Sequence, residues 1–489
     1  MGTINAAFSI ISGALDADQS GLSIIAGNVA NANTPGYTRE IPNWRENPTV
    51  TIGGRSFGTG VTETGATSLR DRVLLERLDQ QQQLASASGT RLSALNLLQS
   101  LFTPASGTAA STAGDIGSDI TGFFSSFAGL EANPSNNALR QQVLSSARTL
   151  AGDISNAAAS IGAQRSALDQ ETAGVADQVN ALTKSIAALN AQIQSTSGDT
   201  DAGVLEDQRQ QDLSKLSQLI GINQIATENN GLTITTASGQ MLVSEGVSSG
   251  ITTGLVNGVA HFFIGSADAT AGLTTGGGQL GGYLTARDQD IPASLKALDQ
   301  LAFGVSVEVN AQNAQGLDLN GNVGAAIFSA PAQVAGSAES MRVTMTDPNQ
   351  IAAAGTGQGT GDNSNAVALA ALAGQSDPPI LNGLTLPDGT VLTAGQTLLG
   401  RQTPSGYFSA FVTSLGSTVS QVETDNTAQS ASVSQLQTQN NALSQVNLND
   451  EASAMTTLER SYQAASQVFA MLNSIIGSAL NLGTQTTVS

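Results

Sequence analysis

Apolar residues at both ends of the chain recur with the alternating three- and four-residue spacing of a coiled coil. The N-terminal set has the polar residue Asp18 at one seam position and otherwise consists of Ile4, Phe8, Ile11, Leu15, Leu22, Ile25 and Val29. The C-terminal set consists of Met455, Leu458, Tyr462, Ala465, Phe469, Leu472 and Ile476. The pattern therefore predicts two heptad helices at opposite ends of a chain of 489 residues.

The other faces of these two helices carry almost no charge. Residues 1–38 contain only Asp16 and Asp18 as charged residues, and residues 451–489 contain only Glu451, Glu459 and Arg460. A solvated helix normally carries charge opposite its apolar stripe, so these helices suit contact with protein on several sides. We predict an antiparallel coiled coil of residues 1–35 with 451–489 that packs among copies of itself. The alternative is two ordinary helices of a monomeric bundle.

The sequence "NANTPGY" is predicted to end the first helix, because its residue types disfavour a helical backbone. Asparagines tolerate left-handed conformations, the residue before a proline is driven out of the helical region, and a glycine permits a tight turn. We therefore predict a hinge between the terminal rod and the body of the protein. Its residues are Asn31, Asn33, Thr34, Pro35, Gly36 and Tyr37.

Composition excludes several classes of function. The net charge of −20, with three lysines in all, argues against a nucleic-acid partner, whose phosphates need a basic face. No cysteine is present, so disulfides, thiol chemistry and thiolate metal sites are excluded. The N-terminus lacks the features of a cleaved secretory signal, and the apolar tail is short and interrupted by polar residues. We expect no membrane insertion, and export, if it occurs, by an uncleaved route.

Periodicity predicts a mainly α fold with β insertions between the two ends. A body of long helices is expected over residues 36–221, 273–320 and 401–450. The period changes to two in "GLTITTASGQMLVSEG", which predicts a small β unit over 222–272. The Gly- and Asn-rich stretch 321–400 contains strand-like runs and is expected to be a β-rich insertion.

Three motifs resemble binding or catalytic sites but lack the context that their chemistry needs. "GGGQLG" at 276–281, with Asp299 downstream, has the glycine spacing of a dinucleotide site but follows no buried strand of a βαβ unit, so we expect a turn before a helix. "DLNGNV" at 318–323 lacks the glycine and the closing acid of a calcium loop. His261 has no cysteine or acid cluster beside it and reads as a strand residue.

A cluster of charges near residue 75 also favours structure over catalysis. Asp71, Glu76 and Asp79 alternate with Arg70, Arg72 and Arg77, which we interpret as a solvated, salt-bridged face of one helix, with contact between subunits as the alternative. We predict no catalytic residue, no cofactor and no metal ligand.

Both ends of the chain resemble a known superfamily. "GNVANANTPGYTRE" and the tail "LERSYQAASQVFAMLNSIIGSAL" are similar to the ends of the bacterial flagellar axial proteins, which comprise rod, hook and hook-associated proteins. Segments within 101–155, 205–222, 276–322 and 361–372 resemble the flagellar hook-associated protein 1 family in order. The chain departs from that family at Asn449-Asp450-Glu451, where more acids are usual, and at Asp18.

The resemblance implies a non-enzymatic structural subunit that joins hook to filament. It implies contacts with other copies of itself, with the hook protein and with hook-associated protein 3, and an export chaperone at the C-terminal helix. It further implies an extracellular place in the bacterial flagellum, reached unfolded through the flagellar type III export apparatus. In the family the terminal helices lie innermost and the inserted domains outermost. The alternatives are a hook or rod subunit and, outside the class, an enzyme with a nucleotide fold.

Overall fold

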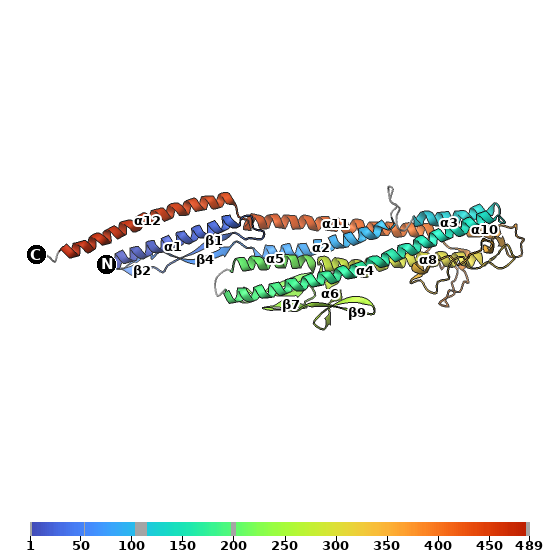
Figure 1. Cartoon of the computed structure of the whole chain (residues 1–489), viewed down its shortest axis with the longest axis horizontal. Coiled ribbons are helices and arrows are strands. Elements are labelled where there is room, and N and C mark those ends of the chain that lie inside the picture. The colour runs from blue at the N-terminus through green and yellow to red at the C-terminus, as the bar shows by residue number, and fades with distance from the viewer. Residues whose placement is uncertain (1, 53, 103–114, 197–201, 486–489) are drawn as a thin grey trace. The chain divides into compact units, whose positions relative to one another are not determined.

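The computed structural model describes residues 2–52, 54–102, 115–196 and 202–485 (Figure 1). The chain divides into two compact units. Unit 1 contains residues 1–86, 175–278 and 428–489, and unit 2 contains residues 87–174 and 279–427. Both units are therefore assembled from segments that lie far apart in the sequence.

Helices account for most of the described residues, which confirms the predicted mainly α fold class. The α-helices are α1 (Gly2–Asn31), α2 (Arg72–Ser100), α3 (Ile116–Glu131), α4 (Asn137–Thr196), α5 (Val204–Leu219), α6 (Thr270–Gly276), α7 (Gly278–Thr285), α8 (Ile291–Asn313), α9 (Ser337–Ser340), α10 (Ser364–Ala371), α11 (Pro404–Ser444) and α12 (Leu448–Gln485). A π-helical turn, η1 (Ala286–Asp290), leads into α8, and short 3₁₀ turns occur at η2 (Pro348–Gln350), η3 (Leu372–Gly374) and η4 (Pro379–Leu381).

The strands form small antiparallel sheets. Those near the N-terminus are β1 (Glu40–Glu46), β2 (Val50–Ile52), β3 (Arg55–Phe57) and β4 (Val61–Ser68), in which β1 pairs with β4 and β2 with β3. A four-stranded sheet consists of β5 (Ile222–Ala226), β6 (Leu232–Thr236), β7 (Met241–Ser244) and β8 (Val247–Ser248). A three-stranded sheet consists of β9 (Ile251–Val256), β10 (Val259–Ile264) and β11 (Ala267–Asp268), and a two-residue pair joins β12 (Gly316–Leu317) to β13 (Ala354–Gly355).

In unit 1 the second half of α4 holds the small β sheets through its asparagines. The Asn190 amide donates to the carbonyls of Leu232 and Glu245 at 2.7 and 3.1 Å. The Asn180 amide donates to the carbonyl of Ile251 and accepts from its backbone N–H, at 2.8 and 2.7 Å. These bonds join the side chains of α4 to the backbone of both small sheets, so the sheets are held against the helix.

Unit 2 is built around a large apolar core. Phe123 on α3 is fully buried and lies within 5.3 Å, between ring centroids, of Phe124, Phe127 and Phe328. Buried residues of α4, α8, α10 and α11 complete the same cluster. Edge-to-face and tilted aromatic pairs of this kind add to the stabilisation that comes from apolar burial.

Within the helical body predicted over residues 36–221, residues 40–68 are not helical. They form β1 to β4 instead. The signal was present in the sequence, because "VTI" and "RSF" flank a Gly-Gly pair, which is the pattern of a short hairpin. The predicted β unit over 222–272 corresponds to β5 to β11, which end at Asp268. The terminal helices also differ slightly in extent, since α1 ends at Asn31 and α12 begins at Leu448.

The prediction of a β-rich insertion over 321–400 is wrong. The described structure there consists of loops, short helices, strand β13 and isolated bridges such as Phe328 with Val343. Asparagines of α8 satisfy the loop backbone in place of a sheet. The Asn310 side-chain oxygen accepts from the N–H groups of Ile327 and Phe328, and Asn313 bonds to Ala325 and Ala352. Alternating apolar residues alone therefore did not distinguish a strand from a loop whose backbone is hydrogen-bonded to side chains.

Glu308 on α8 makes the stability of the fold depend on pH. It is 2% exposed, and burial raises the pKa of its carboxyl from 4.5 to about 8. The unfolded chain releases this proton near its ordinary pKa, whereas the folded chain holds it until about pH 8. The contribution of Glu308 to stability is therefore fully present at low pH and is lost as pH rises through the folded pKa.

We predict that Glu308→Gln raises the free energy of unfolding at pH 8.5 and changes it little at pH 4.5. The gain is expected to be about 1.4 kcal/mol for each unit by which the pKa is raised, as an upper bound. Urea unfolding of both proteins at the two pH values measures it, with the exposed Glu339→Gln as a control. An equal effect of Glu308→Gln at both pH values would contradict the buried, protonated state.

Candidate functional site: the terminal helix pair and its anchoring turn

Helices α1 and α12 pack against each other in antiparallel orientation (Figure 1). The rings of Phe8 and Phe469 lie 4.6 Å apart between centroids. A methyl group added at Gly21 would lie 2.8 Å from Cδ1 of Leu458. Asn28 bonds to Glu451 at 3.1 Å. Each contact lies further along α1 and further back along α12, so the two ends of the chain run side by side.

Most of the predicted seam residues lie on the less exposed faces of the two helices. Ile25 is buried, and partly buried positions are Phe8, Ile11, Leu15, Leu22, Met455, Leu458, Ala465, Phe469, Leu472 and Ile476. Ile4 also lies within α1. Two predicted seam residues, Val29 and Tyr462, are exposed by 40% and 38%. The heptad spacing thus agrees with the less exposed positions of both helices in most places. It does not agree at the end of α1, where Val29 is exposed.

The strands of residues 40–68 explain that difference, because β1 and β4 pack on α1 beside α12. A methyl group at Gly21 would lie 3.3 Å from the ring of Trp44 on β1, and one at Gly13 would lie 3.0 Å from the carbonyl oxygen of Val61 on β4. These contacts bury a second face of α1, which includes Ala17, Gly21 and Asn28. The polar seam residue Asp18 is 8% exposed, and its Oδ2 has no hydrogen-bond partner among the described residues.

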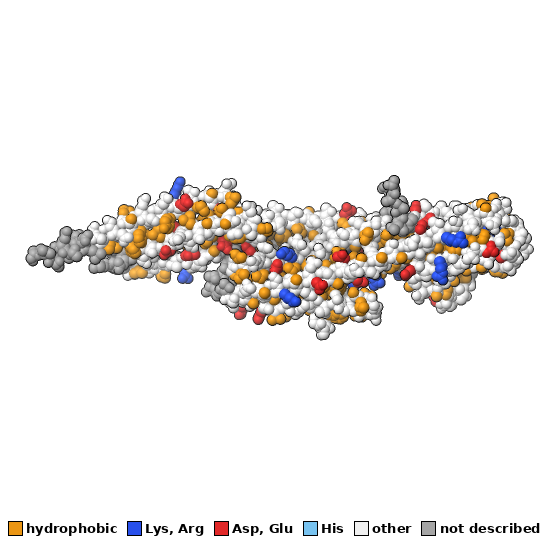
Figure 2. Space-filling view, in the orientation of Figure 1, with side chains coloured by type: hydrophobic (Ala, Val, Ile, Leu, Met, Phe, Trp, Pro, Cys, Tyr) orange, Lys and Arg blue, Asp and Glu red, His pale blue; other side chains and the backbone are white. Residues whose placement is uncertain are grey.

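Apolar residues are also exposed on α12 next to its seam positions. Val468, Met471 and Ile475 follow one another at three- and four-residue spacing and are 40%, 57% and 52% exposed. Residues 461–489 contain no charged residue. Figure 2 shows apolar side chains gathered over the surface of α12. We call Val468, Met471 and Ile475 the outer stripe of α12.

Asn28 is the centre of a buried polar network at the base of the helix pair. Its amide nitrogen donates to the carbonyl of Glu40 at 2.8 Å and to Glu451 at 3.1 Å. Its amide oxygen accepts from the hydroxyl of Tyr37 at 2.9 Å and from the N–H of Glu40 at 3.0 Å. Glu451 also accepts from Arg39 at 2.6 Å. One asparagine, 1% exposed, therefore connects α1, the following turn, β1 and the first turn of α12.

The predicted hinge residues form the turn that enters this network. Backbone bonds run from Thr34 N–H to Asn31 O at 2.9 Å and from Tyr37 N–H to Thr34 O at 3.2 Å. Gly36 takes a φ of 76°, where a glycine has little strain. Asn31 and Asn33 do not take the positive φ that the sequence suggested for them. The turn therefore depends on Gly36 and Pro35, and the Asn31 side chain instead donates to Gly27 O at 3.1 Å.

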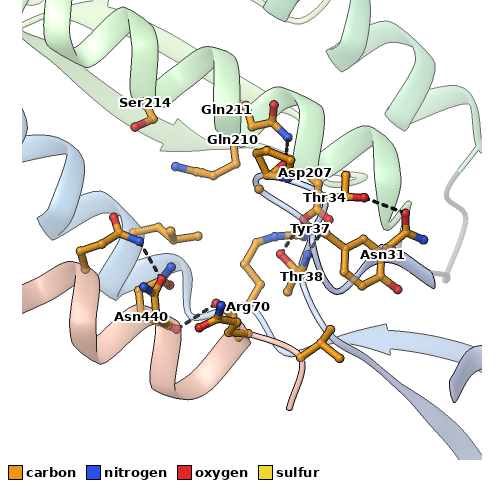
Figure 3. Close-up of a pocket in the computed structure, with 18 of the residues that line it drawn as sticks. Asn31, Thr34, Tyr37, Thr38, Arg70, Asp207, Gln210, Gln211, Ser214 and Asn440 are labelled. Carbon is orange, nitrogen blue, oxygen red and sulfur yellow. Dashed lines mark hydrogen bonds and ion pairs between the residues drawn. The ribbon is translucent and has the colours of Figure 1, made fainter. Parts of the chain in front are cut away.

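Helix α5 holds the other side of the turn (Figure 3). Asp207 accepts from the N–H and hydroxyl of Thr38 at 2.9 and 2.6 Å, and Gln211 donates to the carbonyl of Pro35 at 3.0 Å. Arg70 balances the acids of α5 by pairing with Asp207 and Glu206. Burial, followed by the charges of Glu40, Asp207 and Glu451, raises the pKa of Tyr37 to about 12, so its phenol stays protonated and donates to Asn28.

The turn, α5, α2 and the end of α11 enclose a cavity of about 440 Å³ (Figure 3). Its wall is rich in carboxamides, including those of Asn31, Gln210, Gln211, Asn440 and Asn441. Such groups bind and orient polar groups but do not supply a nucleophile or a general base. The arrangement therefore suits anchoring of the turn better than catalysis.

The charges near residue 75 do not form the single-helix face that we predicted. Arg70 and Asp71 precede α2, and Asp71 caps it by accepting from the N–H groups of Val73 and Leu74. Arg70 and Arg72 pair with acids of α5 instead. Asp79 is 1% exposed, and its pKa is raised to about 6 by burial. Spacing along one helix could not reveal that a second helix, more than 130 residues later, supplies the partners.

The other motifs are structural. Gly277 and Gly278, both at positive φ, make the turn between α6 and α7, and Asp299 accepts from the N–H groups of Gly336 and Ala338. Asp318 accepts from the N–H groups of Asn320 and Asn322 within a turn. His261 lies on β10 and bonds to Asp268 on β11 at 2.7 Å, a partner that the sequence analysis missed.

Within the described ranges no three His, Asp or Glu side chains gather where they could share a metal ion. The same part of the chain holds no helix with the length and apolar character of a membrane span.

Comparison with known proteins agrees with this geometry. Residues 106–328 match the family described as flagellar hook-associated protein FlgK helical domain, and residues 10–38 match the flagella basal body rod protein family. The flagellar hook-associated protein 1 of Escherichia coli (strain K12) is 27% identical over 329 residues. Over its helical domain the chain is therefore similar to flagellar hook-associated protein 1.

The matched relatives show how much of the chain is similar to known proteins. The flagellar hook-associated protein 1 of Salmonella typhimurium is 28% identical, and, as for the E. coli relative, the match covers 64% of this chain and 58% of the relative. The chain thus spans less than two thirds of the length of these relatives. The structure of the flagellar hook junction protein FlgK from Burkholderia pseudomallei has a TM-score of 0.60 at 18% identity, covering 74% of this chain and 99% of that one, which establishes a shared fold.

We predict that Asn28→Ala loosens the helix pair without unfolding the rest of the protein. The substitution leaves the Tyr37 hydroxyl and the backbone of Glu40 without their partner, at a cost of roughly 1–3 kcal/mol for each buried group. Trp44, the only tryptophan, lies against α1, so its fluorescence during urea unfolding reports on this region. Asn33→Ala, at an exposed position in the same turn, is the control. An unchanged midpoint for Asn28→Ala would contradict the role of the network.

Proposed function

We propose that the chain is a structural subunit of the bacterial flagellum that joins hook to filament and assembles through α1 and α12. The relatives with which the chain shares 27% and 28% identity are flagellar hook-associated proteins 1, which supports this function. The observation that carries it is the outer stripe of α12, an exposed apolar face on a helix whose last part has no charge. Such a surface suits burial against other protein, because a helix meant for water carries charge on that side.

Within this function, the terminal helices form the contacts between subunits, and the other segments adapt the hook to the filament. We propose that the rod of residues 1–35 and 451–489, with β1 and β4 packed on it, lies innermost, and that the long helices of the remaining body surround it. The units over 222–272 and 321–400 then face outward. The proposed partners are other copies of the chain, the hook protein, hook-associated protein 3 and an export chaperone that binds the C-terminal helix. The proposed route is the flagellar type III apparatus, and the place is the extracellular flagellum.

This proposal assigns no enzymatic activity to the chain. The carboxamide-lined cavity offers polar anchors to the turn. Of the two acids that line it, Asp207 accepts from Thr38 and pairs with Arg70, and Asp79 accepts from Gln210 and Gln224. A hook or rod subunit is the alternative within the superfamily, supported by the match of residues 10–38 to a rod protein family. The match of residues 106–328 to the hook-associated helical domain favours the junction protein. Antibody labelling of intact flagella tests the choice, since a ring at the hook–filament boundary is expected and label along the hook or rod would contradict it.

We predict that Leu472→Asp prevents assembly and leaves the rest of the protein folded. Leu472 is partly buried on α12, three residues after Phe469, so a carboxylate there faces the seam. An unpaired polar group in such a place costs roughly 1–3 kcal/mol and opens the helix pair. The expected result is a variant that is exported but does not join the hook, so that filament subunits are lost to the medium.

Leu472→Met is the matched control, because it keeps volume and apolar character and is expected to assemble normally. Secretion is measured alongside assembly, since α12 is also the proposed chaperone site, and the melting transition of the purified protein checks the fold. A working junction built from exported Leu472→Asp would contradict assembly through the terminal helices.

A further inference from the structure

The short hairpin of β2 and β3 continues the β1–β4 strand pair and carries two half-exposed apolar side chains. Each strand has three residues, and Val50 pairs across the hairpin with Phe57. These two side chains are 49% and 50% exposed. A two-stranded hairpin is marginally stable at best in water, and an exposed aromatic and β-branched pair gains most when another apolar surface covers it. We call Val50 and Phe57 the hairpin face.

The hairpin face and the outer stripe of α12 lie at the same level along α1. The contact of Phe8 with Phe469 places the outer stripe beside the first turns of α1. A methyl group at Gly60 would lie 3.3 Å from Cα of Ile10, so the strand pair that continues into β2 and β3 meets α1 at the same turns. Figure 1 shows β2 and β4 on the side of α1 away from α12. The elements that carry the two apolar faces therefore lie on different sides of α1, at one level.

We propose that the hairpin face of one copy packs on the outer stripe of α12 of the next copy. This inference rests on the proposed function and names a contact within the assembly. Two different faces of one chain that fit each other form a head-to-tail interface, which generates rings or helical arrays instead of closed dimers. A surface of this type is what a subunit that is repeated around an axis requires.

Charge favours a second copy of this chain as the occupant. Residues 461–489 and residues 1–15 have no charged residue, and residues 47–62 have only Arg55. Arg55 lies on the same face of β3 as Phe57 and is the one charge near the contact; its long side chain keeps the guanidinium in water at the edge, so the desolvation cost is low. The outer stripe and the hairpin face offer almost no charge that could pair with a strongly charged partner. The exposed Met471 and Val468 of the outer stripe also suit the exposed Phe57 ring, because sulfur and aliphatic groups pack well on aromatic faces.

The absence of cysteine from the sequence allows a direct test. The double variant Phe57→Cys with Ile475→Cys is made in the full chain and supplied as the only copy in the bacterium. Flagella are isolated, oxidised and run on a non-reducing gel. Because each copy then carries both halves of the contact, we expect a ladder of covalent trimers, tetramers and larger species. Phe57→Cys with Leu448→Cys is the matched control, since Leu448 is exposed at the other end of α12, and it should give no ladder.

The outcomes separate this inference from the proposed function. If the double variant is incorporated in flagella and gives no ladder, or if the Leu448 control gives an equal one, the contact is wrong and the junction function stands. If the unaltered chain is absent from isolated flagella, the proposed function falls and the contact falls with it. Covalent dimers that never extend to trimers would indicate a symmetric contact and would also overturn the head-to-tail interface.

A second pair of variants covers the case in which cysteine at either position disturbs assembly. Phe57→Lys alone and Met471→Glu alone are each expected to lose filaments, because each places an unpaired charge in the interface. The two together restore a pair of opposite charges across the contact and are expected to recover filaments. Normal filaments from either single variant, or no recovery in the double variant, would overturn the proposal. Circular dichroism of the purified single variants shows that they fold.

Discussion

The antiparallel contact of α1 with α12 is the constraint on which unit 1 depends. It joins the two ends of the chain, so that all other segments are insertions between its two helices. The contacts of Phe8 with Phe469 and of Asn28 with Glu451 set its register near its two ends. Because the register is antiparallel, the turn after α1 and the start of α12 meet at one place, where the polar network closes the base of the pair.

Buried polar side chains determine much of the remaining geometry. Asn28 satisfies four hydrogen bonds at the base of the helix pair, Asn180 and Asn190 hold the small sheets of unit 1, and Asn310 and Asn313 hold the loops of unit 2. An amide can donate and accept at once, so one asparagine fixes two backbone segments without introducing a charge. This use of amides agrees with a chain in which charged residues make up only 11%. Amides therefore supply much of the polar specificity here, beside the ion pairs of Arg39 and Arg70 with buried acids.

The exposed apolar faces of the helix pair connect this geometry to the proposed assembly. The inner seam is occupied within one chain, whereas the outer stripe of α12 and the hairpin face remain half exposed. A rod whose seam is buried within one chain, and whose outer stripe and hairpin face are half exposed, is suited to assembly from many copies. Each added copy covers an apolar face that the previous copy exposes. The anchoring turn, held from α1, α5 and α12, keeps the base of that rod in a defined conformation.

The sequence by itself determined the helices, the pairing of the two ends, the place of the turn and the family resemblance, because these depend on local periodicity and on residues with strong backbone preferences such as Pro35 and Gly36. Only the tertiary structure decided which faces are buried. Strands β1 and β4 cover a second side of α1, so Asn28 became a buried centre and Val29 an exposed residue. The partners of Arg70 and Arg72 lie on α5, and the loops of 321–400 are held by asparagines of α8. Such contacts join residues that are distant in the chain, and no local pattern records them.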